Sequence, residues 1–197
     1  MKTICGSFRL FILMTVITGV IYPLIVSITG NSLFPDKARG SFVIEGGNNI
    51  GSELIGQKFC TERYFWPRPS AVGYDPLPSA GSNLSPSSSV LLHLFRQRGE
   101  EFSALNHLPE GTRIPPEMLF ASASGVDPHC SPEAVYLQIG RVSKSRGFDR
   151  NKTAQLHRLV ERMIISPQLG FLGRPQINVF LLNLELDKLS KNGNYKR

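Results

Sequence analysis

Residues 10–28 read LFILMTVITGVIYPLIVSI, a stretch that contains no charged side chain. As an α-helix it would be about 28 Å long, which matches the roughly 30 Å hydrocarbon core of a bilayer. The apolar part of a cleaved signal peptide is usually only about 7–15 residues long, and the small residues around Ser27 and Gly30 fit a cleavage site poorly. We therefore expect residues 1–34 to form an uncleaved transmembrane anchor.

The charges on either side of this span predict its orientation. Lys2, Arg9 and the amino terminus precede it, whereas Lys37 and Arg39, partly offset by Asp36, follow it. Basic residues favour the cytoplasmic side of a span, and here the difference between the two sides is small. We expect the amino terminus in the cytoplasm and the rest of the chain outside, as in a signal anchor.

Small or kinking residues recur every four positions inside the span: Thr15, Gly19, Pro23 and Ser27. Residues at this spacing form one narrow stripe along a helix, and small side chains there allow a second membrane helix to approach closely. The alternative is that glycine and proline are simply common in membrane helices. If the stripe is used, the protein is one subunit of a larger membrane assembly.

The remaining residues, 35–197, contain no second stretch of spanning length and are expected to form one soluble domain. FVIEGG (42–47) predicts a short strand that ends at glycines. Residues 66–89 are rich in proline and serine, which predicts a long surface loop, and the interleaved Trp66, Arg68 and Tyr74 favour an ordered one.

Three helices are predicted, one from about Ser85, one over residues 131–147 and one over 149–165. The apolar residues expected to face a core are Val90, Leu91, Leu94, Phe95, Val135, Ile139, Val142, Leu156, Leu159, Val160, Met163 and Ile164. In INVFLLNLELD (177–187) apolar residues alternate and then change phase, which predicts a strand with a bulge or one buried on both faces. The expected fold is a single amino-terminal transmembrane helix followed by a mixed α/β soluble domain with a small sheet.

Composition excludes few classes of partner. The chain has 22 basic and 15 acidic residues, a net charge of +7, which is compatible with nucleic acid, an anionic membrane or an acidic protein. The basic residues are scattered, and no nucleic-acid-binding motif accompanies them, so we expect no nucleic-acid binding. The three cysteines, Cys5, Cys60 and Cys130, include no CxxC pair. Cys60 and Cys130 could pair in an oxidising compartment, although free buried thiols are the favoured state.

The segment ASASGVDPHCSP (121–132) places an acid, a base and a thiol within four positions, at Asp127, His129 and Cys130. Ser131 and Pro132 open a predicted helix, so this segment leads into the helix, where a carboxylate is favoured by the exposed N–H groups. Asp127 and His129 are expected on opposite sides of an extended chain, which argues against a catalytic relay. Neither a second pair of metal ligands nor a G-x-S-x-G motif accompanies them, so we expect no metal and no catalytic residue.

Several blocks of the sequence together resemble the C subunit of the Kdp-type potassium-transporting ATPase. Besides the amino-terminal span, these blocks are GSELIGQKF (51–59), YFWPRPSA (64–71), YDPLPSAGSNLSP (74–86), ASASGVDPHCSPEAVYLQIGRV (121–142) and LGFLGRPQINVFLLNLELD (169–187). The chain departs from the family at Ala123, Cys130 and Gly140, where a glycine, an aliphatic residue and a proline are expected. Because Cys130 replaces an apolar residue, we expect a buried thiol.

The resemblance implies a non-catalytic subunit of a potassium-uptake pump in the bacterial inner membrane. Its partners would be a pore-like subunit that carries the ion, a P-type ATPase subunit that hydrolyses ATP, and membrane lipid. The family is described as a catalytic chaperone that raises the ATP affinity of the hydrolysing subunit, and Gln138 stands where the family's glutamine falls. This role conflicts with the expected orientation, because a domain outside the cell cannot touch cytoplasmic ATP.

Two functional hypotheses follow. An accessory subunit would work by contact, and its expected interface residues are Arg68, Ser70, Tyr74, Ser82, Asn83, Ser124, Asp127 and His129. The alternative is a membrane-anchored extracytoplasmic hydrolase that uses His129 or Asp127.

Overall fold

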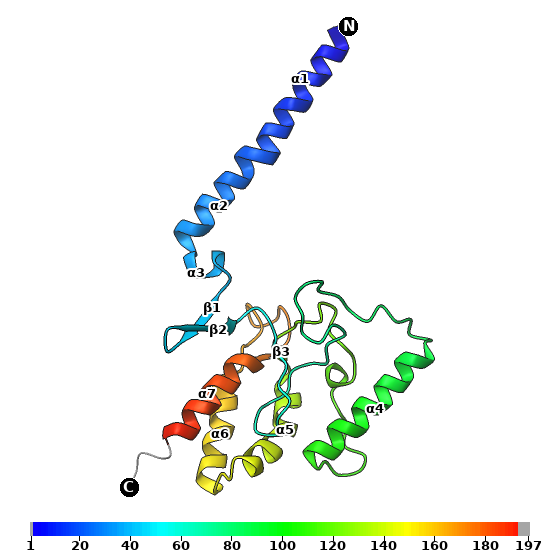
Figure 1. The fold of residues 1–197 in the computed structure, drawn as a ribbon, viewed down its shortest axis with the longest axis vertical. Helices are drawn as coiled ribbons and strands as arrows, with labels where there is room; N and C mark the ends of the chain where they lie inside the picture. Colours follow the sequence, from blue (N-terminus) through cyan, green and yellow to red (C-terminus); the bar gives the residue numbers. More distant parts are fainter. Residues whose placement is uncertain (1, 193–197) are drawn as a thin grey trace. The chain divides into compact units, whose positions relative to one another are not determined.

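A computed structural model describes residues 2–192 and divides the chain into two compact units, one ending at Ser52 and one beginning at Glu53 (Figure 1). The first unit contains α1 (Lys2–Val16), the π-helical turn η1 (Ile17–Ile21), α2 (Tyr22–Leu33), α3 (Pro35–Ala38), β1 (Phe42–Glu45) and β2 (Asn48–Ser52). The second contains α4 (Ser89–Asn106), the 3-10 turn η2 (Pro116–Met118), β3 (His129–Cys130), α5 (Pro132–Ser145), α6 (Arg150–Arg162), β4 (Ile177–Asn178) and α7 (Val179–Asn192). A long apolar helix is thus followed by a mixed helix and sheet domain, which confirms the expected fold class.

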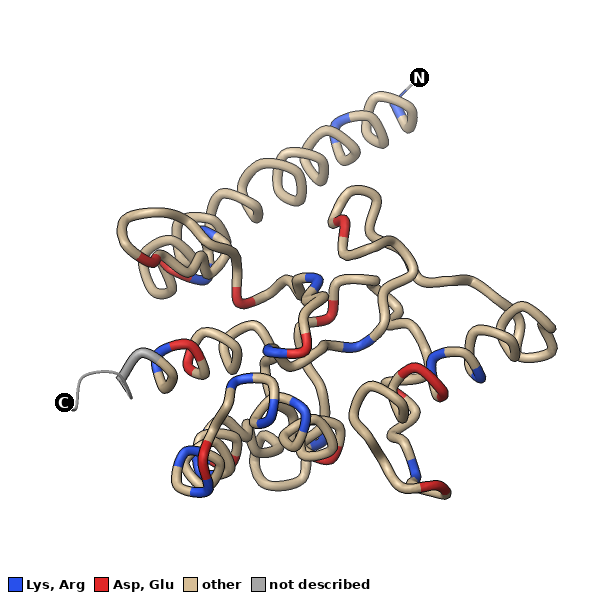
Figure 2. The backbone as a smooth tube through the Cα atoms, turned by 60° about the horizontal axis from the view of Figure 1, so that its bottom comes forward, with Lys and Arg blue, Asp and Glu red and all other residues tan. Residues whose placement is uncertain are grey.

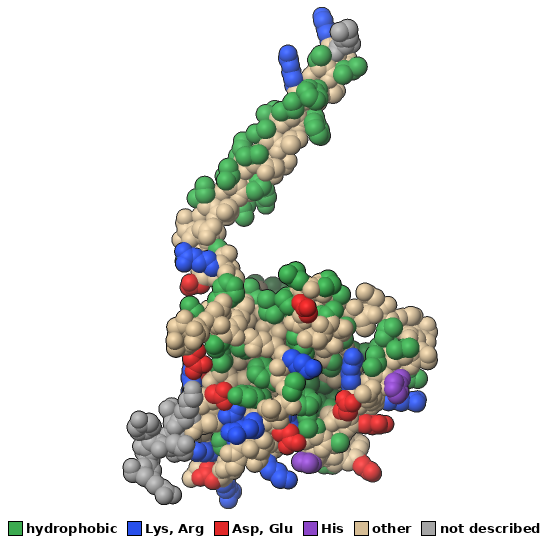
Figure 3. All heavy atoms as spheres, viewed as in Figure 1, with side chains coloured by type: hydrophobic (Ala, Val, Ile, Leu, Met, Phe, Trp, Pro, Cys, Tyr) green, Lys and Arg blue, Asp and Glu red, His purple; other side chains and the backbone are tan. Residues whose placement is uncertain are grey.

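The elements α1, η1 and α2 form one continuous apolar helix from Lys2 to Leu33, 32 residues long with a mean hydropathy of 2.3. No residue of this helix is buried by the rest of the chain. Hydrophobic side chains cover much of its visible face in Figure 3, and Figure 2 shows its charged residues only near the amino-terminal end. Its length and composition are sufficient to cross a bilayer.

The π-helical turn lies directly before Pro23, and the missing N–H of that proline accounts for it. A proline in a helix interior cannot donate to the carbonyl one turn earlier and its ring crowds that carbonyl. Here the Tyr22 N–H donates to the Ile17 carbonyl, a bond that spans five residues. The Thr15 and Thr18 hydroxyls donate to the carbonyls of Phe11 and Met14 at 2.8 and 2.7 Å, so their polar groups are satisfied within the helix.

The strand predicted at 42–47 is confirmed as β1, which pairs antiparallel with β2. Gly46 and Gly47 join them with φ of 59° and 84°, the left-handed conformations that a two-residue type I′ hairpin requires. The Ser52 hydroxyl donates to the Gly40 carbonyl at 2.7 Å and closes the hairpin onto the end of the helical segment.

The core of the second unit lies between α5, α6 and α7. The residues predicted to face it from α5 and α6 are buried: Val135, Ile139, Val142, Leu156, Leu159 and Val160. Met163 and Ile164 are partly buried against them. Ser131 and Asp149 cap the two helices, accepting hydrogen bonds from the N–H groups of Ala134 and Lys152 at 3.2 and 2.7 Å. The apolar spacing and the capping residues therefore predicted both helices correctly.

Helix α4 begins later than predicted, at Ser89, with Ser88 as its capping residue. Val90 was expected in the core and is instead 55% exposed. The buried residues of α4 are Phe102 and Asn106, in its second half, whereas Phe95 in the first half is partly buried against Phe120, with ring centres 5.3 Å apart. Residues 66–88 contain no helix or strand, as expected for the predicted loop.

The predicted strand at 177–187 is wrong, because only Ile177 and Asn178 are extended and α7 begins at Val179. Asn178 caps this helix, accepting a hydrogen bond from the Leu181 N–H at 3.1 Å, and its own amide donates to the Glu53 carbonyl at 2.7 Å. The buried residues Val179, Leu182 and Leu186 recur at helical spacing. Because leucines also stand at adjacent positions, the same residues fit the alternating pattern of a strand. The role of Asn178 as a capping residue was therefore overlooked.

Candidate functional site

Two buried side chains of α5, Gln138 and Arg141, hold the segment that carries Trp66. They lie one turn apart and are 0% and 2% exposed. The Gln138 amide accepts from the Trp66 N–H at 2.8 Å and donates to the Trp66 carbonyl at 3.1 Å. Both main-chain groups of one residue are thus bound by one side chain, as in a strand pair, although no strand is present there.

Arg141 binds the same segment through its whole guanidinium group. Nη1 donates to the carbonyls of Glu62 and Tyr64 at 2.6 and 3.0 Å, Nη2 to Gln138 at 2.8 Å and Nε to Asn106 at 2.9 Å. The guanidinium also lies 5.3 Å from the centre of the Trp66 ring. Burial lowers the pKa of Arg141 to about 10, and the Glu62 carboxylate opposes this shift.

A third buried amide completes this arrangement from α7. Asn183 accepts from the Phe65 N–H and donates to the Phe65 carbonyl, both at 2.9 Å. We call Gln138, Arg141 and Asn183 the clamp, because together they fix residues 62–66. Of these three residues, only Gln138 was predicted from the sequence, and the polar residues at core positions of α5 and α7 were the overlooked signal.

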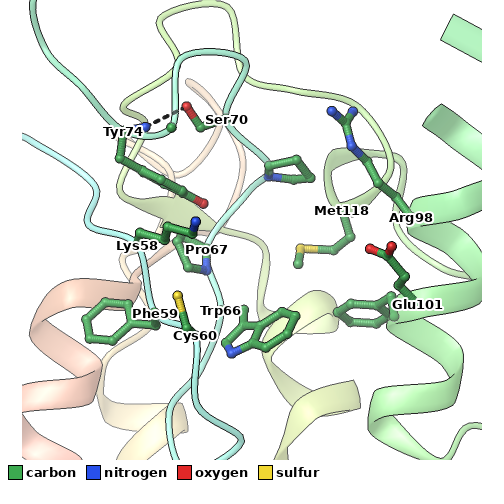
Figure 4. Close-up of a pocket in the computed structure, with 13 residues that line it drawn as sticks. Lys58, Phe59, Cys60, Trp66, Pro67, Ser70, Tyr74, Arg98, Glu101 and Met118 are labelled. Atoms are coloured by element: carbon green, nitrogen blue, oxygen red, sulfur yellow. Dashed lines mark hydrogen bonds between the residues drawn. The ribbon is translucent and has the colours of Figure 1, made fainter. Parts of the chain in front are cut away.

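Trp66, which the clamp holds in place, lines a cavity of about 390 Å³ (Figure 4). Trp66, Pro67 and Tyr74 approach it from the loop, Met118 from η2, and Arg98 and Glu101 from α4. Lys58 and the exposed Cys60 complete the lining on the side opposite α4. The lining is largely apolar with a few charged groups, a composition typical of ligand and peptide pockets.

Tyr74 is fixed within this cavity by the loop itself. Its N–H donates to the Ser70 hydroxyl at 2.9 Å, and its hydroxyl donates to the Arg68 carbonyl at 2.5 Å. Burial, with Cys130 and Cys60 nearby, raises the pKa of Tyr74. The phenol is therefore a neutral hydrogen-bond donor at physiological pH.

A second, smaller cavity of about 210 Å³ lies beside Arg68, Asp127, His129 and Arg174. Arg68 Nη1 donates to Asp127 Oδ2 at 2.9 Å, while Asp127 Oδ1 accepts from the His129 N–H at 3.0 Å and lies 3.4 Å from His129 Nδ1. The expectation that Asp127 and His129 lie on opposite sides of the chain is wrong. An aspartate side chain can accept from the N–H two residues later, and this Asx turn brings the two groups together.

Burial alone would raise the pKa of Asp127, but the hydrogen bonds from His129 and Arg68 outweigh it and the pKa is lowered. The carboxylate is therefore charged throughout the physiological range. It joins the long loop to the segment that leads into α5.

Further contacts pack the long loop against residues 122–125. The Ser122 N–H donates to the Pro69 carbonyl at 3.0 Å, and the Ser79 hydroxyl donates to the Ser124 carbonyl at 2.8 Å. Gly125 has a φ of 73°, and a Cβ there would lie 2.7 Å from the Ala80 carbonyl oxygen. Only glycine fits this contact without strain.

The structure thus brings together most of the residues expected at an interface. Arg68, Ser70, Tyr74, Ser124, Asp127 and His129 all belong to the packed loop and its support. Ser82 and Asn83 are exposed further along the loop and take part in none of these hydrogen bonds.

Gln138 lies inside the unit, and both ends of its amide are occupied by main-chain groups and Arg141. In this conformation Gln138 can influence the surface only by holding Trp66 in place. Its link to ATP therefore stays a prediction.

The chemically reactive groups of the site are poorly suited to catalysis. Cys130 is buried, as expected, and burial raises the pKa of its thiol. Its sulfur lies 4.0 Å from the Met118 sulfur, and both it and the exposed Cys60 are free thiols. Among residues 2–192, no three His, Cys, Asp or Glu side chains gather closely enough to hold a metal ion.

Known proteins of one kind resemble this chain over nearly its whole length. The family model described as KdpC, the K+-transporting ATPase c chain, matches residues 4–188. The potassium-transporting ATPase KdpC subunit of Geotalea uraniireducens is 43% identical over 97% of this chain and 100% of its own. That of Leptospira interrogans is 41% identical over 92% of this chain and 91% of its own.

Replacing Arg141 with methionine should destabilise the second unit by about 2–4 kcal/mol, because several buried acceptors lose their donor. Trp66 is the one tryptophan of the sequence and lies against Arg141, so its fluorescence reports urea unfolding of the full chain in detergent. The matched variant Arg158→Met removes an exposed arginine of α6 and should change stability by less than about 0.5 kcal/mol. Equal losses in the two variants would contradict the clamp.

The lowered pKa of Asp127 predicts a stability term that is complete above the usual aspartate pKa of 3.8 and lost as the pH falls through the lower folded value. Asp127→Asn should therefore be about 1–2 kcal/mol less stable than wild type at pH 7, and this difference should shrink below about pH 4. Urea titrations of both proteins at pH 7 and 3 measure it. Glu110→Gln, at an exposed acid, serves as the control, and a constant difference for Asp127→Asn would refute the assignment.

Proposed function

Because this chain belongs to the KdpC family of K+-transporting ATPase c chains, we propose that it is the accessory subunit of an ATP-driven, high-affinity potassium-uptake pump. The observation that carries this proposal is the extent of the family match, which covers residues 4–188 and so includes both the apolar helix and the second unit. The subunit would be anchored by Lys2–Leu33 in the bacterial inner membrane, surrounded by lipid and by the membrane helices of its partners. Thr15, Gly19, Pro23 and Ser27 would form the surface on which one of those helices packs.

We propose that the subunit works by contact and hydrolyses nothing itself. The polar groups of its candidate site are largely occupied within the chain, since Asp127 holds Arg68 and His129, and Gln138 holds Trp66. Such a site offers a fixed surface instead of a reactive group. Its partners would be the pore-like potassium-translocating subunit and the P-type ATPase subunit.

The chaperone role of the family, raising the ATP affinity of the ATPase subunit, would then be indirect. With the amino terminus in the cytoplasm, the second unit lies outside the cell and influences the nucleotide site through assembly. Gln138 would contribute by fixing Trp66 and the cavity beside it, which agrees with its complete burial. Under this proposal ATP is bound by the complex and not by Gln138 directly.

The hydrolase alternative gains one observation, the proximity of Asp127 Oδ1 and His129 Nδ1 at 3.4 Å. An Asp–His pair orients an imidazole for general-base catalysis, provided that a nucleophile lies on its other side. The neighbouring thiol of Cys130 is buried with a raised pKa, and the Ser131 hydroxyl caps α5. We therefore favour the accessory role.

Replacing Asp127 or His129 with alanine separates the two functions. Loss of the Asp127 contacts should release the long loop and weaken assembly about tenfold, with potassium-stimulated ATPase activity falling in proportion. The measurement is co-purification of the other pump subunits from solubilised membranes, followed by the ATPase assay. His93→Ala and Glu110→Ala alter exposed residues outside the site and serve as controls. An intact complex that loses activity toward a substrate of this chain's own would favour the hydrolase instead.

The orientation is tested by labelling Cys60, which is exposed, with a membrane-impermeant maleimide. A Cys5→Ser background leaves Cys60 as the one exposed thiol. With the second unit outside, Cys60 should be labelled to a similar extent in intact and in permeabilised cells. Labelling that requires permeabilisation would place the unit in the cytoplasm and make direct contact with ATP possible.

A further inference from the structure

The connection between α6 and α7, orange in Figure 1, exposes several large apolar side chains. It forms a short hairpin over residues 165–176, in which Leu169, Phe171 and Leu172 are 82%, 74% and 50% exposed. These residues are close in sequence, and they contribute nothing to the core of the second unit. Exposed apolar groups gathered in one place commonly mark a surface that binds something.

This hairpin is held in one shape by its own main chain. Ile165 and Gln176 exchange two hydrogen bonds of 2.8 and 3.1 Å, and Gln168 and Leu172 exchange two more of 3.0 and 2.9 Å. Leu169, at its tip, has a φ of 53°, and the two glycines beside the apolar residues also have positive φ. A surface that is ordered before binding loses less entropy on association, so this shape suits a specific complementary partner.

The base of the hairpin is joined rigidly to the segment that contains Asp127. β4 pairs with β3, where His129 faces Asn178, and the Val179 N–H donates to the Pro128 carbonyl at 2.8 Å. Arg174, near the end of the hairpin, lines the same small cavity as Asp127 and His129. The apolar tip and this charged cavity therefore form one continuous surface.

Arg174 is the cation of this surface that is free to pair with a carboxylate of another molecule. Arg68 is paired with Asp127, whereas Arg174 is exposed and no carboxylate pairs with it among the described residues. The sequence contains no acidic residue between Glu161 and Glu185, so none on the hairpin itself can neutralise it. An exposed arginine beside apolar anchors is a typical composition for a protein interface.

We propose that the 165–176 hairpin docks on a protein partner within the pump. Phe171, with Leu169 and Leu172, enters an apolar pocket of that partner, and Arg174 pairs with a carboxylate at the pocket's edge. This inference rests on the proposed function and adds the 165–176 hairpin as a docking surface; the hairpin contains none of the interface residues expected from the sequence.

The charges around the tip favour a protein over a lipid surface. Binding to an anionic bilayer uses several cations near the apolar groups. Here Arg174 is the one basic residue of the hairpin, and the carboxylates of Asp127 and Glu117 line the adjoining cavity. Arg68 also lines that cavity but is paired with Asp127, which leaves Arg174 as the one unpaired cation among the described residues of its lining. A single cation suits one carboxylate of a protein better than a bilayer of anionic lipids.

The test compares Phe171→Ser and Arg174→Glu in the full chain, expressed with the other pump subunits. Each should weaken co-purification of those subunits by about tenfold or more, as expected for anchor residues of an interface. Leu92→Ser and Arg162→Glu are matched controls, because Leu92 is 50% exposed and Arg162 is also exposed, and both lie outside the hairpin and the long loop. Both controls should assemble like wild type. Unchanged assembly of both hairpin variants would overturn the proposal.

A fluorescent reporter separates the protein partner from lipid. Gln168→Cys, with Cys5 and Cys60 replaced by serine, is labelled with an environment-sensitive dye beside the tip. Its emission should shift to the blue in the assembled pump and not in the subunit alone, reconstituted in phosphatidylcholine–phosphatidylglycerol vesicles. Quenching of the lone subunit by brominated lipids would instead assign the hairpin to the bilayer and overturn the proposal. Failure of the wild-type chain to co-purify would refute the proposed function itself, a result distinct from unchanged assembly of the variants.

Discussion

The second unit depends on one constraint: residues 62–66 run from the surface to the buried Phe65 and the partly buried Trp66 without forming a strand. Their main-chain N–H and C=O groups must still be satisfied, since an unpaired buried polar group costs about 1–3 kcal/mol. The clamp meets this requirement with side chains, Gln138 for Trp66, Asn183 for Phe65, and Arg141 for the carbonyls of Glu62 and Tyr64. The long loop that follows can therefore leave the core at a fixed point, and the two cavities take their shape from it.

This arrangement explains which parts of the fold the sequence could predict. Helices α5 and α6 are amphipathic and locally capped by Ser131 and Asp149, so short-range patterns were sufficient. Helix α7 was not predicted, because nearly all of its first residues are apolar and such a run fits a strand and a helix equally well. Its capping residue, Asn178, was decisive, but its bond to the Glu53 carbonyl spans more than a hundred positions and is invisible to any local pattern.

The candidate site shows the same division. The resemblance to a family pointed to Gln138, the composition of the 66–89 loop to Arg68 and Tyr74, and the segment 121–132 to Asp127. None of these patterns indicated what the residues touch. The Asx turn that joins Asp127 to His129 depends on a side-chain rotamer, whereas a simple alternation of side chains in an extended segment predicts separation. The partners Arg141 and Asn183 went unnoticed because polar residues are usually exposed, and only the fold shows that these two are buried.

A buried polar group whose hydrogen bonds are all made within the protein is not available to react or to bind a ligand, and its role is structural. Gln138, Arg141 and Asn183 are in this position, and Asp127, although partly exposed, has both carboxylate oxygens occupied by Arg68 and His129. The groups that retain binding capacity lie elsewhere, in the exposed apolar side chains of the 165–176 hairpin and in Arg174. An accessory subunit needs this distribution, because it must hold a shape reliably while offering a partner only apolar area and charge. The rigidity of the clamp and the exposure of the hairpin are then two requirements of the same function.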